Sequence, residues 1–437
     1  MLTQLEAARQ GRITEQMAYV AAQEGLEPER VRELVAVGRV VIPANPHHTS
    51  LTHFTAIGEE MRVKVNANIG TSYDYVNVDE EVEKARVAIR YGADTVMDLS
   101  TGGDLSAIRQ RILEVCTVPL GTVPIYEAEF RAASRSSVFD MTADEMFQVI
   151  EEHGRQGVDY ITVHAGVTLE TLRRYRQSER VTGIVSRGGG LMAAWMLKNG
   201  RENPLWERFD DLLEIAREYD MTLSLGDGLR PGSIADSTDR AQLQELILIG
   251  ELVERARRAG VQAMVEGPGH IPLGEIQANV QVQKRLTGGA PFYILGMLPV
   301  DTGAGFDHIV GAIGGAVAGW HGADMLCYLT PAEHLGLPTV EHVREGVIAF
   351  KLAAHIADVA RGRRIDVERN RHMSEARYAL DWERQFQLAL YPEEARRLYA
   401  ERGSHTRACS MCGPFCPMNL VEAVLRHHVP VDALAPA

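Results

Sequence analysis

Residues 63–100 read VKVNANIGTSYDYVNVDEEVEKARVAIRYGADTVMDLS. An apolar run opens the stretch, apolar residues from Val78 to Ile89 then recur at helical spacing, and a second apolar run closes it. Asn77 and Glu80 form a plausible capping pair in front of the helix. A strand, a helix and another strand in this order predict a parallel sheet covered by helices.

The same alternation continues to about residue 331 and predicts the fold. The candidate strands are VKVNANIG (63–70), DTVMDLS (94–100), VPLGTVPIY (118–126), YITVHAG (160–166), GIVSRGGG (183–190), LSLGDGLRPG (223–232), AMVEGPGH (263–270), FYILGML (292–298) and MLCYLTP (325–331). Eight strand–helix units close into a (β/α)8 barrel, so one of these runs, at an end or GIVSRGGG, lies outside it. We predict an α/β fold of the TIM-barrel type, with a small N-terminal region and a C-terminal helical segment.

The flanking sequences differ from the barrel pattern. Helix starts near Thr3, Thr14 and Pro28 predict short N-terminal helices, and the sequence after the barrel is almost wholly helical. The expected segments are an N-terminal helical region (1–60), the barrel (61–338), a C-terminal helical domain (339–403) and a cysteine loop with its tail (404–437).

Charge and hydropathy exclude some partners. Lysine and arginine number 45 against 59 aspartates and glutamates, a net charge of −14, whereas a nucleic-acid-binding surface needs a basic footprint. No run approaches the roughly 18 apolar residues of a membrane span, and the first residues are polar. We expect a cytoplasmic protein with reduced thiols and no nucleic-acid or membrane partner.

Polar side chains gather at the carboxyl ends of the candidate strands, which meet on the active-site face of a barrel. The candidates are Asn68, Met97, Asp98, Tyr126, His164, Ser186, Arg187, Gly188, Asp227, Gly228, Leu229, Arg230, Glu266 and His270. Any one of them alone is more simply a polar residue that bonds the backbone. So many together predict one site.

Two of these strand ends combine arginine with glycine, and two other turns end in histidine. SRGGG (186–190) and GDGLRPGS (226–233) offer backbone N–H groups and a guanidinium to a phosphate or carboxylate, or are tight turns with a surface arginine. His270 and His334 follow sharp turns and suit zinc or a similar divalent ion, or are hydrogen-bonded polar residues.

Three of the five cysteines lie within CSMCGPFC (409–416). Among reduced thiols, such clustering indicates metal ligands or catalysts rather than disulfides. Three thiolates leave one iron of a [4Fe–4S] cluster open, whereas a structural zinc site has four ligands. We favour a cluster on Cys409, Cys412 and Cys416, with a zinc site completed by His405, or unbound thiols, as alternatives.

The segments NANIG, MDLSTGG, GTVPIYEA, VSRGG, LGDGLRPGSIAD, EGPGH, PFYILG, TPAEHLGLP and CSMCGP, taken together and in this order, resemble a family of atypical radical S-adenosylmethionine enzymes. The resemblance covers about residues 3 to 418. Its two branches are phosphomethylpyrimidine synthase of thiamine biosynthesis and 5-hydroxybenzimidazole synthase of anaerobic cobalamin biosynthesis. Both act on 5-aminoimidazole ribotide.

The resemblance implies a radical lyase with a [4Fe–4S] cluster on Cys409, Cys412 and Cys416, whose open iron binds S-adenosylmethionine and allows a 5′-deoxyadenosyl radical to form. It implies zinc or iron on His270 and His334. The substrate contacts it implies are Asn68, Met97, Tyr126, His164, Ser186, Arg187, Gly188, Asp227, Gly228, Leu229, Arg230, Glu266 and Tyr293, with Glu266 and the three cysteines counted as catalytic. It also implies an electron donor such as flavodoxin or ferredoxin, and a homodimer that exchanges its C-terminal segments.

One segment distinguishes the two branches. LPVDTGAGFDH (298–308) stands where the thiamine branch has LTTDIAPGYDH, so three hydroxyl groups are lost and only Thr302 is gained. The changed hydrogen bonding and the short cysteine spacing favour 5-hydroxybenzimidazole synthase, with phosphomethylpyrimidine synthase as the alternative. A different class, a zinc-dependent barrel hydrolase using His270, His334 and a carboxylate, also fits the histidines.

Overall fold

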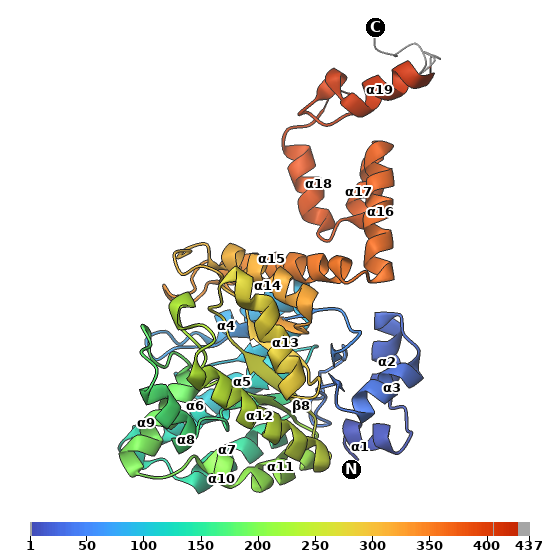
Figure 1. The fold of residues 1–437 in the computed structure, drawn as a ribbon. Helices are drawn as coiled ribbons and strands as arrows, with labels where there is room; N and C mark the ends of the chain where they lie inside the picture. The colour runs from blue at the N-terminus through green and yellow to red at the C-terminus, as the bar shows by residue number, and fades with distance from the viewer. Residues whose placement is uncertain (1, 405, 427–437) are drawn as a thin grey trace. The chain divides into compact units, whose positions relative to one another are not determined.

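The protein is described by a computed structural model that covers residues 2–404 and 406–426, except for the side chains of 422–426. The chain divides into two compact units, residues 1–358 and the residues from 359 onward (Figure 1). His405, which we considered as a zinc ligand, lies outside the described residues, as does the end of the predicted tail.

The first unit contains a closed barrel of eight parallel strands, which confirms the predicted fold. Around the barrel the order is β10-β3-β4-β5-β6-β7-β8-β9. The strands are β3 (Lys64–Ile69), β4 (Thr95–Asp98), β5 (Leu120–Thr122), β6 (Tyr160–Val163), β7 (Thr222–Leu225), β8 (Ala263–Gly267), β9 (Phe292–Leu295) and β10 (Met325–Cys327). Because helices cover the outside and side chains fill the inside, nearly every strand residue is buried.

The barrel interior is filled in part by one large side chain. Tyr160 is fully buried, and its ring occupies the space that a Cβ on Gly121 of the neighbouring strand would need, at 2.2 Å. Its hydroxyl donates a hydrogen bond of 2.8 Å to Oδ1 of Asn66 across the barrel. The glycine in the predicted run VPLGTVPIY is therefore required by packing rather than by a turn.

Two of the predicted strands differ from the structure. GIVSRGGG, already suspected as the ninth run, forms no strand, because Ser186 caps a helix that starts at Arg187. The run at 118–126 forms only the short β5, and the helix α6 begins at Pro124. Tyr126 therefore lies in the first turn of α6 rather than at a strand end.

Helices connect and surround the strands (Figure 1). They are α4 (Val78–Arg90), α5 (Leu105–Leu113), α6 (Pro124–Arg135), α7 (Ala143–Gln156), α8 (Leu169–Arg176), α9 (Arg187–Asn199), α10 (Pro204–Glu207), α11 (Phe209–Glu218), α12 (Arg240–Arg258), α13 (Ile276–Leu286), α14 (Asp307–His321) and α15 (Val340–Ala360), with 3₁₀ turns η1 (Val138–Asp140), η2 (Ile234–Asp236) and η3 (Leu273–Glu275). The Asn77 side chain accepts a hydrogen bond from the Glu80 N–H and so starts α4, as predicted.

The N-terminal residues form three short helices and a strand pair. These are α1 (Gln4–Arg9), α2 (Glu15–Glu24), α3 (Pro28–Ala36), β1 (Val40–Val41) and β2 (Ile57–Gly58). Thr3 and Thr14 cap the first two helices and Pro28 occupies the first turn of the third, which confirms the predicted helix starts.

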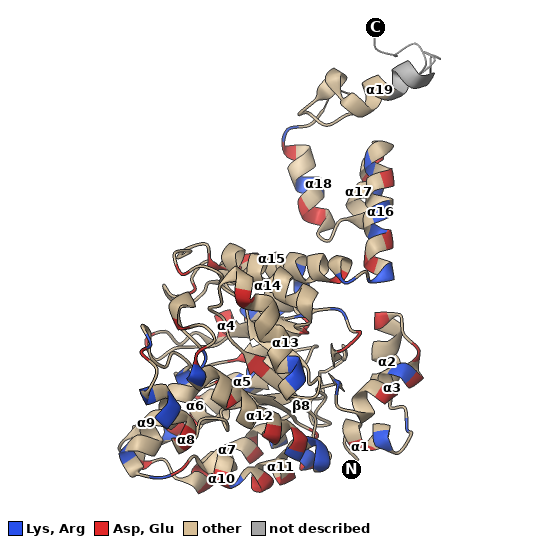
Figure 2. Cartoon of the chain, in the orientation of Figure 1, with Lys and Arg blue, Asp and Glu red and all other residues tan. Residues whose placement is uncertain are grey.

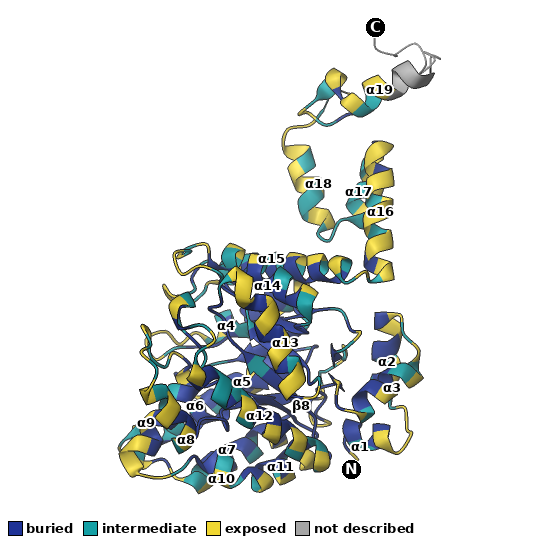
Figure 3. Cartoon of the chain, in the orientation of Figure 1, coloured by how far each residue is buried: buried dark blue, intermediate teal, exposed yellow. Residues whose placement is uncertain are grey.

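The second unit is helical and thinly packed. It contains α16 (Arg364–Tyr378), α17 (Trp382–Leu388), α18 (Pro392–Glu401), η4 (Gly413–Phe415) and α19 (Pro417–Arg426). Exposed side chains cover most of α16–α18 (Figure 3), and both signs of charge lie along them (Figure 2). A small cluster of Leu380, Ala408 and Cys416 is its only apolar core among the described residues.

No helix within the described part of the chain is both long and apolar enough to cross a membrane. The segment boundaries predicted at residues 60, 338 and 403 stay predictions.

Candidate active site

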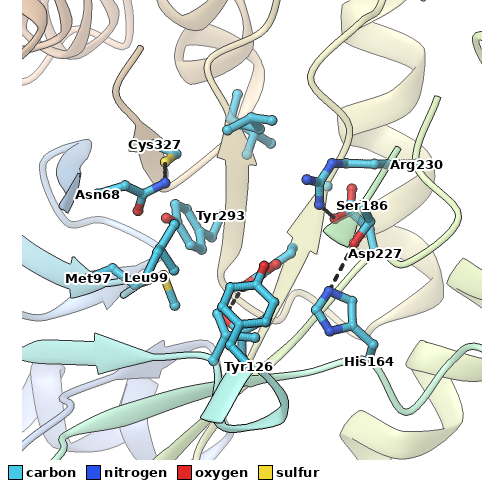
Figure 4. Close-up of a pocket in the computed structure, with 16 residues that line it drawn as sticks. Asn68, Met97, Leu99, Tyr126, His164, Ser186, Asp227, Arg230, Tyr293 and Cys327 are labelled. Atoms are coloured by element: carbon cyan, nitrogen blue, oxygen red, sulfur yellow. Dashed lines mark hydrogen bonds and ion pairs between the residues drawn. The ribbon is translucent and has the colours of Figure 1, made fainter. Parts of the chain in front are cut away.

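A cavity of about 490 Å³, counting the open space at its mouth, lies at the carboxyl ends of the barrel strands (Figure 4). Nine of the predicted site residues line it, namely Asn68, Met97, Tyr126, His164, Ser186, Asp227, Arg230, Glu266 and Tyr293. Strand-end positions far apart in the sequence thus converge, as the barrel pattern predicted.

Glu266 on β8 is one of two carboxyl residues that line the cavity, together with Asp227. Its Oε1 accepts hydrogen bonds from the hydroxyls of Thr162, at 2.6 Å, and Ser224, at 2.7 Å. Burial, reinforced by the nearby Asp227, raises the pKa of Glu266 to about 7. Near neutral pH this carboxyl group can therefore either accept or donate a proton.

The side of the cavity formed by β3, β9 and β10 carries a neutral polar network. Asn68 Nδ2 donates to the Sγ of Cys327 at 3.0 Å, and Asn66 Nδ2 donates to Asn68 Oδ1 and to the Tyr293 hydroxyl, both at 2.7 Å. Burial raises the pKa of the Cys327 thiol to about 12, so it stays protonated. Figure 4 shows Cys327 beside Asn68.

Sequence reasoning missed Asn66, Thr162, Ser224 and Cys327. Each lies in a barrel strand and takes part in the hydrogen bonds of the barrel interior. The period-two alternation of polar and apolar residues is the signal that would have found Asn66, Thr162 and Ser224, whereas the run that contains Cys327 shows no such alternation.

On the opposite side, His164 faces Ser186, the residue that caps α9 (Figure 4). Nε2 of His164 lies 3.1 Å from the serine Oγ, whereas its buried Nδ1 has no hydrogen-bond partner among the described residues. Burial and the positive charge of Arg230 lower the pKa of His164 to about 3, so the ring is neutral. In the neutral ring one nitrogen donates and the other accepts, and Nδ1 lies against Gly188, where an added Cβ would stand 2.4 Å from it.

Asp227 and Arg230, which follow β7, form an ion pair at the same side of the cavity. Nη1 of Arg230 donates to Oδ1 of Asp227 at 3.2 Å, while Oδ2 of Asp227 is buried and unbonded among the described residues. Burial raises the pKa of Asp227. Buried polar atoms without partners are unusual, and at a cavity wall they indicate where a polar ligand binds.

The two glycine-rich runs touch each other through their backbones. A Cβ on Gly189 would lie 2.3 Å from the carbonyl oxygen of Gly228, and one on Gly188 would lie 2.3 Å from the His164 ring. Glycine is thus needed here for close approach. Gly188, Gly228 and Leu229 do not line the cavity, and the guanidinium of the exposed Arg187 lies 5.1 Å from the centre of the Tyr126 ring.

His270 and His334 lie together, with ring centroids 5.4 Å apart. The Nδ1 atoms bond to carboxylates, His270 to Asp301 at 2.8 Å and His334 to Asp307 at 3.1 Å. This leaves both Nε2 atoms for a metal, in the orientation that carboxylate partners give to metal-binding histidines. Both carboxylates hold the histidine rings, and among the described residues no third side chain completes a hydrolase-type zinc site.

The cysteine loop supplies three thiols on one short turn. Cys409, Cys412 and Cys416 are free, and the turn is held by Gly413 N–H, which donates to the Cys409 carbonyl at 3.0 Å. Within the described ranges, no group of three or more His, Cys, Asp or Glu side chains is placed to hold a metal ion. Three soft donors on one short turn fit an iron–sulfur cluster in number and chemistry; their side chains are not gathered for it.

Comparison with known proteins gives a consistent result. Residues 3–423 match the Radical SAM ThiC family. A phosphomethylpyrimidine synthase of Thermus thermophilus is 80% identical over 97% of this chain and 98% of its own, and one of Desulforamulus reducens is 54% identical over 97% and 98%. A solved dihydropteroate synthase of Xanthomonas albilineans aligns with a TM-score of only 0.42 at 12% identity, over 73% of this chain and 98% of that one.

These relatives overturn the expectation of 5-hydroxybenzimidazole synthase, which was wrong. The structure shows why the segment at 298–308 misled us. Val300 and Phe306 are 44% and 64% exposed, and no residue of that segment lines the cavity. The lost hydroxyls therefore do not reach a ligand held there. The zinc-dependent hydrolase is likewise wrong, because the matched family is a radical one.

Proposed function

The chain belongs to the Radical SAM ThiC family, and from this premise we propose that it catalyses the phosphomethylpyrimidine synthase reaction of thiamine biosynthesis. It would convert 5-aminoimidazole ribotide into 4-amino-5-hydroxymethyl-2-methylpyrimidine phosphate, with S-adenosylmethionine as co-substrate. The observation that carries the proposal is the 80% identity to a phosphomethylpyrimidine synthase over nearly the whole of both chains.

The cofactor would be held by Cys409, Cys412 and Cys416. A [4Fe–4S] cluster with bound S-adenosylmethionine supplies, on one-electron reduction, the radical that starts the rearrangement of the substrate. The three thiols leave one iron without a protein ligand, and that open position suits S-adenosylmethionine.

The barrel cavity would hold the ribotide. The cavity combines apolar walls with a few convergent polar groups, which is the usual composition of a small-molecule site. The ribotide phosphate would lie at the start of α9, where Ser186 and the first-turn N–H groups meet the positive helix end, with Arg187 and Arg230 nearby. A few local charges suffice for one phosphate, in agreement with the acidic net charge of −14.

The remaining cavity residues would orient the ring and sugar. Glu266 and Asp227 provide carboxyl groups with raised pKa values, and the lowered pKa of His164 provides a neutral ring nitrogen. Apolar walls exclude water from a reactive radical. They consist of Met97, Leu99, Val123, Ile294 and Leu295.

Three further parts of the proposal rest on family resemblance. The Nε2 atoms of His270 and His334 would hold a divalent metal, zinc or iron, since imidazole ligands suit both. A low-potential protein such as flavodoxin or ferredoxin would donate the electron, and two chains would exchange their C-terminal segments. Met411 and Phe415, 90% and 78% exposed, supply apolar surface for such an exchange.

The test is anaerobic reconstitution of the full chain with iron and sulfide, followed by reaction with 5-aminoimidazole ribotide, S-adenosylmethionine and a reductant. We expect a brown protein that forms the pyrimidine phosphate, identified by mass spectrometry together with 5′-deoxyadenosine. Formation of 5-hydroxybenzimidazole, or turnover in air with zinc alone, would contradict the proposal.

A matched pair of loop variants serves as the control. Cys412→Ser removes one proposed cluster ligand, and Ser410→Ala changes a neighbour in the same loop. We expect the first variant to be colourless and inactive and the second to behave like the unmodified chain. Equal activity in both would remove the cluster from the proposal.

A further inference from the structure

Arg180, in the loop between α8 and α9, uses every hydrogen-bond donor of its guanidinium. A guanidinium has five N–H groups, and each has an acceptor here. Nε donates to Asp239 Oδ2 at 2.8 Å, Nη1 donates to the carbonyls of Gly183 and Arg230, both at 3.2 Å, and Nη2 donates to Asp239 Oδ1 at 2.8 Å and to the Leu229 carbonyl at 2.5 Å.

This arginine is buried although it belongs to a surface loop. Its side chain is 2% exposed and that of its partner Asp239 is 17% exposed, and its guanidinium lies 5.9 Å from the centre of the Tyr175 ring. A buried charge persists only when it is paired and fully hydrogen-bonded. Because no N–H group is free, Arg180 cannot itself bind a phosphate, in contrast to Arg187 and Arg230.

The acceptors belong to two different loops and one helix. Gly183 stands three residues before Ser186, while Leu229 and Arg230 form the loop after β7 that carries Asp227. Asp239 caps the first turn of α12 by accepting a hydrogen bond from the Gln242 N–H at 2.8 Å. Arg180 therefore ties the segment that precedes Ser186 and the loop after β7 to the fixed start of a helix.

Two buried carboxylates on the same side of the barrel complete the attachment. Asp236 accepts hydrogen bonds from the N–H groups of Val181, at 2.7 Å, and Thr182, at 3.0 Å. Glu245 on α12 accepts one from the Leu229 N–H at 2.7 Å. Asp236 belongs to the same β7–α12 connection as Leu229 and Arg230, so its bonds also join the two loops, and the Arg180 side chain adds bonds to the Leu229 and Arg230 carbonyls.

We propose that Arg180, held by Asp239, is a positioning residue that sets the distance between the Ser186–Arg187 loop and the Asp227–Arg230 loop and thereby determines the affinity for the ribotide. Figure 4 shows Ser186, Asp227 and Arg230 on the same side of the cavity. The inference rests on the proposed function, because these loops are the ones proposed to hold the substrate phosphate.

The test measures binding of 5-aminoimidazole ribotide to the reconstituted full chain by calorimetry, without reductant, so that no turnover occurs. Arg180→Gln removes both the positive charge and the planar guanidinium with its five N–H donors. We expect the dissociation constant for the ribotide to rise at least about tenfold, because several charged hydrogen bonds are lost. Arg173→Gln is the control. This arginine of α8 is 74% exposed and paired with Glu170, so we expect a change of less than about twofold.

Two conservative variants distinguish a loss of loop positioning from a general folding defect. Asp239→Asn keeps the helix cap, because asparagine caps as well as aspartate, but loses the charge that orients Arg180. Arg180→Lys keeps the positive charge but loses the planar guanidinium that donates to several acceptors at once. We expect both to fold, and both to bind the ribotide more weakly than the unmodified chain and more tightly than Arg180→Gln.

In turnover the same variants should raise KM more than they lower kcat, because the reacting groups on β3, β8 and β9 are untouched. They should also release more 5′-deoxyadenosine per molecule of product, a ratio that a purely structural defect would leave unchanged. Unaltered ribotide affinity in Asp239→Asn and Arg180→Lys would overturn the inference, whatever happens to Arg180→Gln.

Hydrogen–deuterium exchange separates failure of this inference from failure of the proposed function. If the unmodified chain does not bind the ribotide, the proposed substrate is wrong, and the positioning role is judged from exchange alone. In Arg180→Gln, peptides covering residues 181–190 and 226–232 must then exchange faster together. Faster exchange in the first segment only would show that Arg180 does not hold the second loop.

Discussion

The barrel mouth and the cysteine loop differ in how far their functional side chains are fixed. At the mouth, Glu266 is held by two hydroxyls, Asn68 by a thiol, and the loop after β7 by Arg180. In the loop, three cysteines are free, only Cys412 and Cys416 contact the small apolar cluster, and Met411 is 90% exposed. Pre-organised groups bind a small substrate without a large ordering cost, whereas metal centres often order the segment that binds them.

The largest effect on activity is expected from a variant of the cysteine loop. Cys412→Ser should abolish product formation, because the cluster loses one of its three proposed ligands. Since the mouth is held by its own hydrogen bonds, the variant should still bind 5-aminoimidazole ribotide with unchanged affinity, as measured by calorimetry. A parallel loss of ribotide affinity would show that the mouth depends on the loop.

Gly189→Ala tests how rigidly the mouth is built. A Cβ at this position would stand 2.3 Å from the backbone of Gly228, and overpacking against backbone costs on the order of 3 kcal/mol. Thermal unfolding should therefore shift to lower temperature, and ribotide affinity should fall with it.

The neighbouring Gly190 provides the matched control. Its nearest atom to an added Cβ lies at 3.9 Å, and the residue is inside the first turns of α9. Gly190→Ala should leave affinity unchanged and raise the free energy of unfolding by up to about 1 kcal/mol, because alanine favours a helix over glycine. Equal destabilisation in both variants would show that the contact with Gly228 is not the cause.

Glu266→Gln tests the electrostatics of the mouth. Folding raises the pKa of this carboxyl from 4.5 to about 7, so ionisation opposes folding. Stability contributed by the protonated group is lost as pH rises from about 4.5 to about 7. At pH 8 the glutamine variant should be more stable by up to about 3 kcal/mol.

The measurement is denaturant unfolding of Glu266→Gln and the unmodified chain across pH. The difference in free energy of unfolding should shrink as pH falls toward 5 and vanish near the pKa of the unfolded group. A constant difference at all pH values would mean that glutamine acts by packing instead. Gln keeps an oxygen for the Thr162 and Ser224 hydroxyls, so the hydrogen bonds themselves are preserved.

The smallest effect is expected in the cysteine loop. Gly413 has a φ of +51° and no atom within 4 Å of an added Cβ. Gly413→Ala should therefore cost only about 1 kcal/mol of local conformational strain, and iron content after reconstitution should remain near that of the unmodified chain. A complete loss of iron would show that the loop is as tightly specified as the mouth.

The barrel was predictable because its signal is repeated. Each strand–helix unit shows the same periodicity, and the strand ends of a barrel must converge, so His164 and Glu266 could be placed in one site without coordinates. The local backbone structure at individual strand ends was harder to predict. Pro124 starts a helix directly after β5, and Ser186 caps another, so two predicted strand ends became helix starts.

Residues whose role depends on distant neighbours escaped the sequence analysis. Arg180 has no motif of its own, and its acceptors lie up to 59 positions away along the chain. Cys327 looks like an ordinary apolar strand residue. The choice of reaction failed for the opposite reason, because the changed residues at 299, 300 and 306 are conspicuous in sequence and lie away from the cavity.

Asp227 lines the cavity, and its Oδ2 is buried without a hydrogen-bond partner among the described residues. The desolvation of this oxygen weakens the ligand-free protein, and a substrate that bonds to it returns that free energy on top of its other contacts. The melting temperature of the protein therefore reports whether a ligand occupies the barrel cavity. Compounds can be ranked by how far they raise it, without any radical chemistry taking place.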